Sequence, residues 1–97
     1  MYAMRGMQDA DALVRRVYRA IHHKQALTLT YVKEEGEITV RTVEPWKVEL
    51  SEYRNVYMRT YDRDTGDVRS FRLDRILFYS VHRTRRLVPN EYEEATT

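Results

Sequence analysis

The feature that most constrains the fold is a change in hydrophobic period near Ala26. Before it, apolar residues recur every three or four positions, which is the spacing of one face of an α-helix. After it, apolar and polar residues alternate with a period of two, as in strands that bury one face. The pattern predicts a helix over residues 9–24, with Asp9 as its N-cap, packed against a sheet. Its apolar stripe consists of Ala10, Leu13, Val14, Val17, Tyr18 and Ile21.

The region after the helix divides into five short segments separated by turn signals. Pro45 interrupts the second segment, which predicts a sheet edge or a bend at that point. No connection is long enough for a crossover helix, so we expect antiparallel strands that curl into a small barrel. The predicted strands cover residues 26–32, 38–43, 54–61, 68–73 and 77–83, with 46–50 as a candidate continuation of the second and a tight bend at 74–76.

Length and composition fit one domain. The chain has 97 residues, of which 42% are hydrophobic and 33% are charged, as in globular proteins. It contains no cysteine, no apolar run of the roughly 18–20 residues that a membrane span needs, and no signal-peptide pattern. We therefore expect a cytoplasmic protein with no membrane association. The predicted organisation is an N-terminal extension over residues 1–8, a barrel domain with its leading helix over 9–88, and an acidic flexible tail over 89–97.

Arginine and tyrosine are the residues that suggest binding. Fourteen of the 17 basic residues are arginines, whose planar guanidinium groups suit phosphate and stack on aromatic rings. The third predicted strand places Tyr57, Arg59 and Tyr61 on one face, and Val56 and Met58 on the other. Surfaces that stack bases and neutralise phosphates have this composition, although a merely amphipathic strand in an arginine-rich chain gives the same alternation. Neighbouring strands contribute Arg41, Arg69, Phe71 and Arg72.

Three segments together resemble the WYL domain family. They are Val43-Glu44-Pro45-Trp46, then Val56-Tyr57-Met58-Arg59-Thr60-Tyr61-Asp62, and Arg69-Ser70-Phe71-Arg72-Leu73-Asp74-Arg75-Ile76, the last matching the family's closing segment over eight positions. The resemblance covers roughly residues 20–83. It implies an Sm-like or SH3-like small barrel that serves as a ligand sensor in bacterial transcription regulators and defence-associated proteins. It also implies a basic pocket, which in some members binds single-stranded DNA or nucleotides.

The resemblance assigns roles to particular residues. Tyr57 is the central tyrosine of the name-giving triplet, whose Trp and Leu are replaced here by Val56 and Met58. Arg69 and Arg72 are the arginines of the closing segment. The winged-helix segment that precedes the domain in such regulators is expected to be missing, since there is room for one helix only. The predicted site for a ligand or nucleic acid comprises Tyr31, Arg41, Tyr57, Arg59, Arg69, Phe71 and Arg72.

The position of Arg72 has two interpretations. Arg69 and Arg72 are three residues apart on one strand, so regular alternation sends their side chains to opposite faces. Both can reach one ligand only if a bulge, or the bend at Asp74, redirects Arg72. Without such a distortion, Arg72 is expected to pair with an acid such as Asp74.

The leading functional hypothesis is a non-enzymatic, regulatory module that binds single-stranded nucleic acid or a nucleotide-like anion. The alternative is a protein-interaction or oligomerisation module whose open strand edges pair with another protein, and we expect a homo-oligomer, most simply a dimer. No residues assemble a nucleophile, a base and an oxyanion site. His22 and His23 point about 100° apart on a helix and cannot clasp one metal ion. No metal or cofactor is therefore expected.

Overall fold

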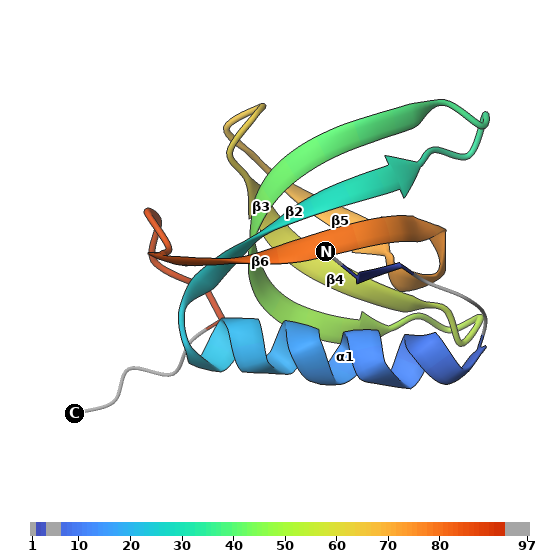
Figure 1. Cartoon of the computed structure of the whole chain (residues 1–97), viewed down its shortest axis with the longest axis horizontal. Coiled ribbons are helices and arrows are strands. Elements are labelled where there is room, and N and C mark those ends of the chain that lie inside the picture. Colours follow the sequence, from blue (N-terminus) through green and yellow to red (C-terminus); the bar gives the residue numbers. More distant parts are fainter. Residues whose placement is uncertain (1, 4–6, 93–97) are drawn as a thin grey trace.

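The computed structural model, which describes residues 2–3 and 7–92, contains one α-helix and a single antiparallel sheet (Figure 1). The helix and the five long strands predicted from the sequence are all present, and a two-residue strand precedes the helix. No helix among the described residues is long and apolar enough to cross a membrane. The elements are β1 (Tyr2–Ala3), α1 (Met7–His22), β2 (Gln25–Val32), β3 (Ile38–Leu50), β4 (Val56–Asp62), β5 (Asp67–Arg72), the 3₁₀ turn η1 (Leu73–Arg75) and β6 (Ile76–Arg85).

The N-cap expected for the helix was wrong, whereas the bend expected at Pro45 is present. The helix begins at Met7, so Asp9 lies within its first turn and not at the N-cap. Pro45 lies within β3, a strand of 13 residues, so the continuation of the second predicted strand over residues 46–50 is confirmed. The ladder to β4 shifts register between Pro45 and Lys47, so Trp46 is an extra residue at that point. A bulge of this kind accommodates proline, which has no backbone N–H to donate to the ladder, and it bends the strand.

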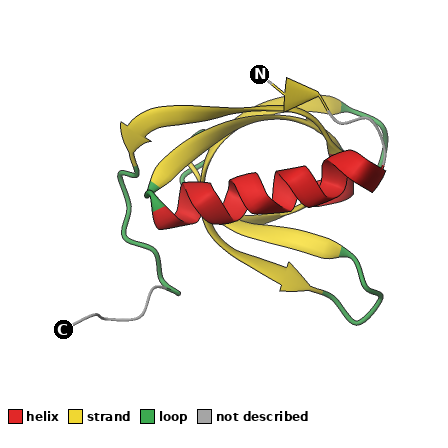
Figure 2. Ribbon diagram, turned by 60° about the horizontal axis from the view of Figure 1, so that its bottom comes forward, coloured by secondary structure: helices red, strands yellow, loops and turns green. Residues whose placement is uncertain are grey.

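The sheet is strongly curved but not closed. The strands are hydrogen-bonded in the order β1-β6-β2-β3-β4-β5, which leaves β1 and β5 as the edges among the described residues. Figure 2 shows the strands curving almost into a ring, with α1 lying across one end. The mainly β, antiparallel architecture with one helix is confirmed, whereas the closed barrel that we expected is not, because no backbone ladder joins β5 to the opposite side.

The core lies between α1 and the concave face of the sheet. Leu13 and Val17, four residues apart on the helix, are fully buried with Leu29 of β2 and Met58 of β4. Fully burying an aliphatic side chain stabilises the fold by roughly 1.5–3 kcal/mol. The burial of Met58 confirms that the face of β4 opposite Tyr57, Arg59 and Tyr61 is the one that meets the core.

A buried glutamate fastens the segment that follows β6. Glu44, only 1% exposed, accepts hydrogen bonds from Arg63 Nε at 2.7 Å and from the backbone N–H groups of Leu87 (2.8 Å) and Val88 (2.9 Å). Farther along, the Asn90 amide donates to the Trp46 carbonyl at 2.8 Å. Residues 89–92, the first part of the predicted tail, therefore contact the sheet. Residues 93–97 lie outside the described residues, as do residues 1 and 4–6 of the predicted N-terminal extension.

Replacing Glu44 by alanine should lower the free energy of unfolding by about 3 kcal/mol, because it removes one partner of a buried pair and leaves two backbone donors without an acceptor. Urea unfolding followed by the fluorescence of Trp46 measures the change. Glu49→Ala is the matched control, since the Glu49–Lys47 pair is exposed and should contribute at most about 1 kcal/mol. Equal stability of the two variants would contradict the role assigned to Glu44.

Candidate ligand-binding site

The two sides of the open sheet approach each other where β5 faces β2. The backbone N–H of Arg72, on the edge strand, donates to the hydroxyl of Tyr31 at 3.0 Å. The rings of Tyr31 and Phe71 meet edge to face, with centroids 5.0 Å apart. A side chain thus satisfies a donor that a backbone ladder would satisfy in a closed barrel. We call this gap between β5 and the β2–β3 hairpin the seam.

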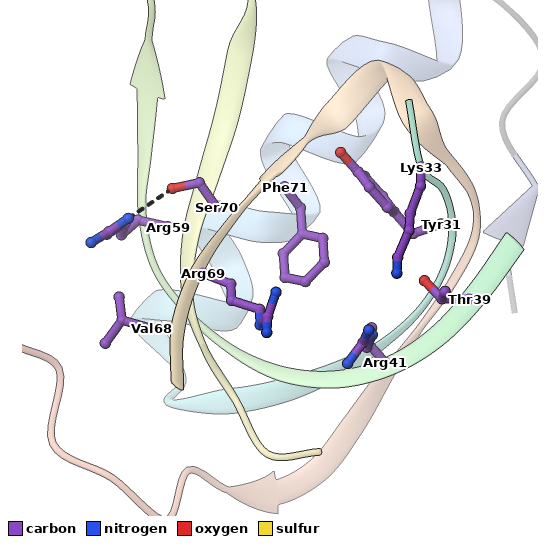
Figure 3. A pocket seen from close by; sticks show the side chains of 9 residues that line it. All are labelled: Tyr31, Lys33, Thr39, Arg41, Arg59, Val68, Arg69, Ser70 and Phe71. Carbon is purple, nitrogen blue, oxygen red and sulfur yellow. Dashed lines mark hydrogen bonds between the residues drawn. The ribbon is translucent and has the colours of Figure 1, made fainter. Parts of the chain in front are cut away.

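A cavity of about 290 Å³ lies at the seam, close to the lower end of the roughly 300–1,000 Å³ of small-molecule pockets. Strands β2 and β3 form one wall and β5 the other, with one residue from β4 (Figure 3). Of its nine lining residues, four are cationic and none is a histidine, aspartate or glutamate. The lining consists of Tyr31, Lys33, Thr39, Arg41, Arg59, Val68, Arg69, Ser70 and Phe71.

A single buried carboxylate lies next to two of these cations. Asp62 is 0% exposed, and its Oδ2 lies 3.6 Å from Arg41 Nη1 and 3.7 Å from Arg69 Nε. Both distances exceed a hydrogen bond, and Oδ2 has no hydrogen-bond partner, while Oδ1 accepts from the Asp64 N–H at 2.9 Å. Asp62 therefore lies beside both guanidinium groups. Arg69 also has Asp67 Oδ2 at 4.0 Å and donates from Nε to Thr65 Oγ1 at 3.2 Å. The side chains of Arg41 and Arg69 are 19% and 46% exposed, so their remaining donors can meet a ligand.

The wall formed by β2 and β3, which carries Arg41, adds a hydroxyl and a further cation. Thr39 Oγ1 is buried and has no hydrogen-bond partner, although it lines the cavity. A buried polar atom without a partner is costly, and a ligand in the cavity could supply the missing bond. Lys33 lies on the same wall, paired at the exposed surface with Glu37 at 3.6 Å. The cavity thus offers positive charge and hydrogen-bonding groups beside the rings of Tyr31 and Phe71.

The structure brings five of the seven predicted site residues together: Tyr31, Arg41, Arg59, Arg69 and Phe71. Tyr57 and Arg72 do not line the cavity. They are paired across β4 and β5, and regular alternation along each strand places them on the convex face. Arg59 reaches the cavity rim from that face, held by Ser70 Oγ at 3.1 Å and the Tyr92 hydroxyl at 3.3 Å.

Arg72 pairs with Asp74, as expected for a strand without a distortion that redirects its side chain. Its Nε and Nη2 donate to the two oxygens of Asp74 at 2.9 and 2.6 Å, and Nη2 also donates to Asn55 at 3.3 Å. The side-chain hydrogen bonds to Asp74 raise the pKa of Arg72 above its ordinary value. No register shift interrupts the β4–β5 ladder, so nothing redirects Arg72 towards Arg69.

The sequence-based reasoning missed Lys33, Thr39 and Asp62. A usable signal existed for the first two, because Lys33 is two residues from Tyr31 and Thr39 is two residues from Arg41, on the same strand faces. Asp62 lies just beyond the strand predicted over residues 54–61, so alternation assigned it to neither face. Its burial depends on the curvature of the sheet, which the pattern of residues does not reveal.

Comparisons with known proteins agree with this architecture. The family model of the WYL domain matches residues 12–81. Among solved structures, the proteasome accessory factor B/C (PafBC) of Arthrobacter aurescens is similar with a TM-score of 0.73 and 24% sequence identity. The similarity covers 89% of this chain but only 13% of that one, so this chain corresponds to a small part of the larger protein. None of the curated proteins matches the chain.

Tyr31→Phe should loosen the seam without disturbing the core. Loss of the hydroxyl that accepts from the Arg72 N–H should cost about 1 kcal/mol and speed hydrogen exchange of that amide. Exchange measured by NMR, residue by residue, tests this expectation. Tyr18→Phe, on the exposed face of α1, is the control. Unchanged exchange at Arg72 in Tyr31→Phe would show that the hydroxyl does not bridge the seam in solution.

Proposed function

The chain belongs to the WYL domain family, and from that membership we propose that the cavity at the seam binds a nucleotide-like anion or a short stretch of single-stranded nucleic acid. The observation that carries the proposal is the charge balance at the cavity. Four cations line the cavity, against three acids among the described residues that lie within 4.0 Å of any of them: Asp62 beside Arg41 and Arg69, Asp67 beside Arg69, and Glu37 beside Lys33. A phosphate between Arg41 and Arg69 would restore the balance and accept charge-assisted hydrogen bonds.

The aromatic rings of the cavity support a nucleotide, in place of inorganic phosphate, as the proposed ligand. Tyr31 and Phe71 both line the cavity, so a base could contact their rings while its phosphate meets the arginines. The Thr39 hydroxyl would hydrogen-bond the sugar or the base. The absence of an acid or a histidine from the described lining supports binding without catalysis.

We further propose that the module is regulatory, acting in the cytoplasm as the ligand-sensing part of a transcription or phage-defence system. In that role the ligand would change how the domain meets the protein or nucleic acid that it controls. The seam suits such a response, because a ligand between β5 and the β2–β3 hairpin would draw together two walls that no backbone ladder joins.

A second candidate function is a protein-interaction or oligomerisation module. The observation that favours it is an apolar patch on the convex face, where Ile38 and Val40 are 61% and 64% exposed and the neighbouring Phe78 is 41% exposed. The edge strand β5 also leaves backbone groups unpaired with another strand. A homodimer that covers either surface is compatible with ligand binding at the seam.

Arg69→Ala should weaken binding of a labelled pentathymidylate by roughly 1.5–3 kcal/mol, the contribution of hydrogen bonds to a charged group, without unfolding the protein. Fluorescence anisotropy over a series of salt concentrations measures the affinity, which should fall as salt rises because bound phosphates release counterions. Arg72→Ala is the matched control: it removes the same charge from the same strand, but from the face turned away from the cavity. Equal binding by the two variants, or binding indifferent to salt, would refute the proposed site.

A further inference from the structure

A second concentration of positive charge lies away from the seam. Residues 12–32 contain four lysines and arginines, residues 76–90 contain three, and neither stretch contains an aspartate or a glutamate. The fold brings the two stretches together, because α1 leads into β2 and β2 pairs with β6. The two segments that meet here thus carry no acid, and the nearest acid on the described part of α1 is Asp11, one turn before Arg15.

The two segments line a groove. A hollow of about 450 Å³ between α1 and the sheet is lined by Arg16, Arg19, Gln25, Ser80 and Arg83, among others. An adjoining hollow of about 490 Å³ along the helix shares Arg16 and Arg19 and adds Arg15. We call the two together the basic groove. It shares no residue with the cavity at the seam.

Folding does not explain why these cations gather. The helix dipole favours positive charge in the last turn, which accounts for Arg19, but Arg15 lies in the middle of α1 and Arg83 lies on β6. Arginines one helical turn apart repel each other. No ion pair of Arg15, Arg19 or Arg83 is found within the described part of the chain. An anion from outside the chain would offset this repulsion.

We propose that the basic groove binds the phosphate backbone of a nucleic-acid duplex, independently of the sequence of bases. Its cations at the helix and at β6 are all arginines, whose forked donors match phosphate oxygens. Arg15 and Arg19 follow one another along the helix at a separation of about 6 Å, suited to successive phosphates. Gln25 and Ser80 add neutral hydrogen-bonding side chains, which commonly contact phosphate and sugar.

The residues that line the basic groove favour a duplex over other anionic partners. It contains no aromatic ring, so it lacks the stacking platform that single-stranded nucleic acid uses. Its apolar members are small or largely covered, with Ala12, Ala20 and Val81 and no bulky exposed group that would insert into a membrane. The cavity at the seam has the opposite character, with two rings among its cations.

The proposal is tested with the double variant Arg19→Gln/Arg83→Gln and a labelled 20-base-pair duplex of mixed sequence. The intact protein should bind with a dissociation constant on the order of 10⁻⁴–10⁻⁶ M, typical of binding that ignores sequence. The double variant should bind at least roughly tenfold more weakly, and the slope of log affinity against log salt should fall by about two, one for each phosphate contact removed.

Two controls keep the result interpretable. Arg54→Gln/Arg75→Gln removes the same charge outside the basic groove and should leave most duplex binding intact. Arg69→Ala should leave duplex binding unchanged while it weakens the pentathymidylate, so failure at the seam and failure at the groove are distinguishable. Thermal unfolding by circular dichroism checks that each variant is folded.

Three outcomes would overturn the proposal. The first is equal loss of duplex binding in the two double variants, which would mean that net charge alone is responsible. The second is tighter, Arg19- and Arg83-dependent binding of a single strand of the same length. The third is absence of duplex binding together with binding to vesicles of phosphatidylglycerol, which would assign the groove to a membrane surface.

Discussion

Strand β3 changes partner along its length, and the rest of the structure depends on that change. Its first half, Ile38–Val43, pairs with β2, and its second half, from Val43 to Leu50, pairs with β4. The register shift between Pro45 and Lys47 bends the strand where the partners exchange. As a result β4 and β5 turn back over the concave face, and the edge of β5 comes to face β2. Without the bend, Tyr31 and Phe71 could not meet.

This curvature leaves the seam open, and the cavity at the seam is the proposed ligand-binding site. Its two walls are joined by side chains: the Tyr31 hydroxyl at one end, and Arg41 and Arg69 beside Asp62 at the other. A closed ladder would have occupied the same backbone groups and filled the gap. Instead a buried carboxylate lies beside two guanidinium groups whose positive charge exceeds its own. The same feature that keeps the barrel open thus also concentrates charge at the opening.

The sequence predicted the element types well and the site in part. Alternation predicted all five long strands and separated Met58 from the polar face of its strand. The reason is that a strand buried on one face alternates apolar and polar residues with a period of two. At Pro45 the sequence predicted a sheet edge or a bend, and the structure has a bend at a bulge through which the strand continues to Leu50. Five of the seven proposed site residues line one cavity, whereas Tyr57 and Arg72 face the other way. Family resemblance pointed to both arginines of the closing segment, and only strand geometry separated them. Asp62 could not be assigned because its burial arises from contacts between segments distant in sequence.

The central claim is that Arg41 and Arg69 hold the ligand at the seam. The most direct measurement follows the Nε–Hε resonances of the arginine side chains during titration of the protein with pentathymidylate. The account predicts large shifts and slower solvent exchange at Arg41 and Arg69, with Arg54 and Arg75 unchanged, because a bound phosphate engages and shields only the first pair. A saturable binding curve that leaves Arg41 and Arg69 unperturbed, or no binding at all, would contradict it.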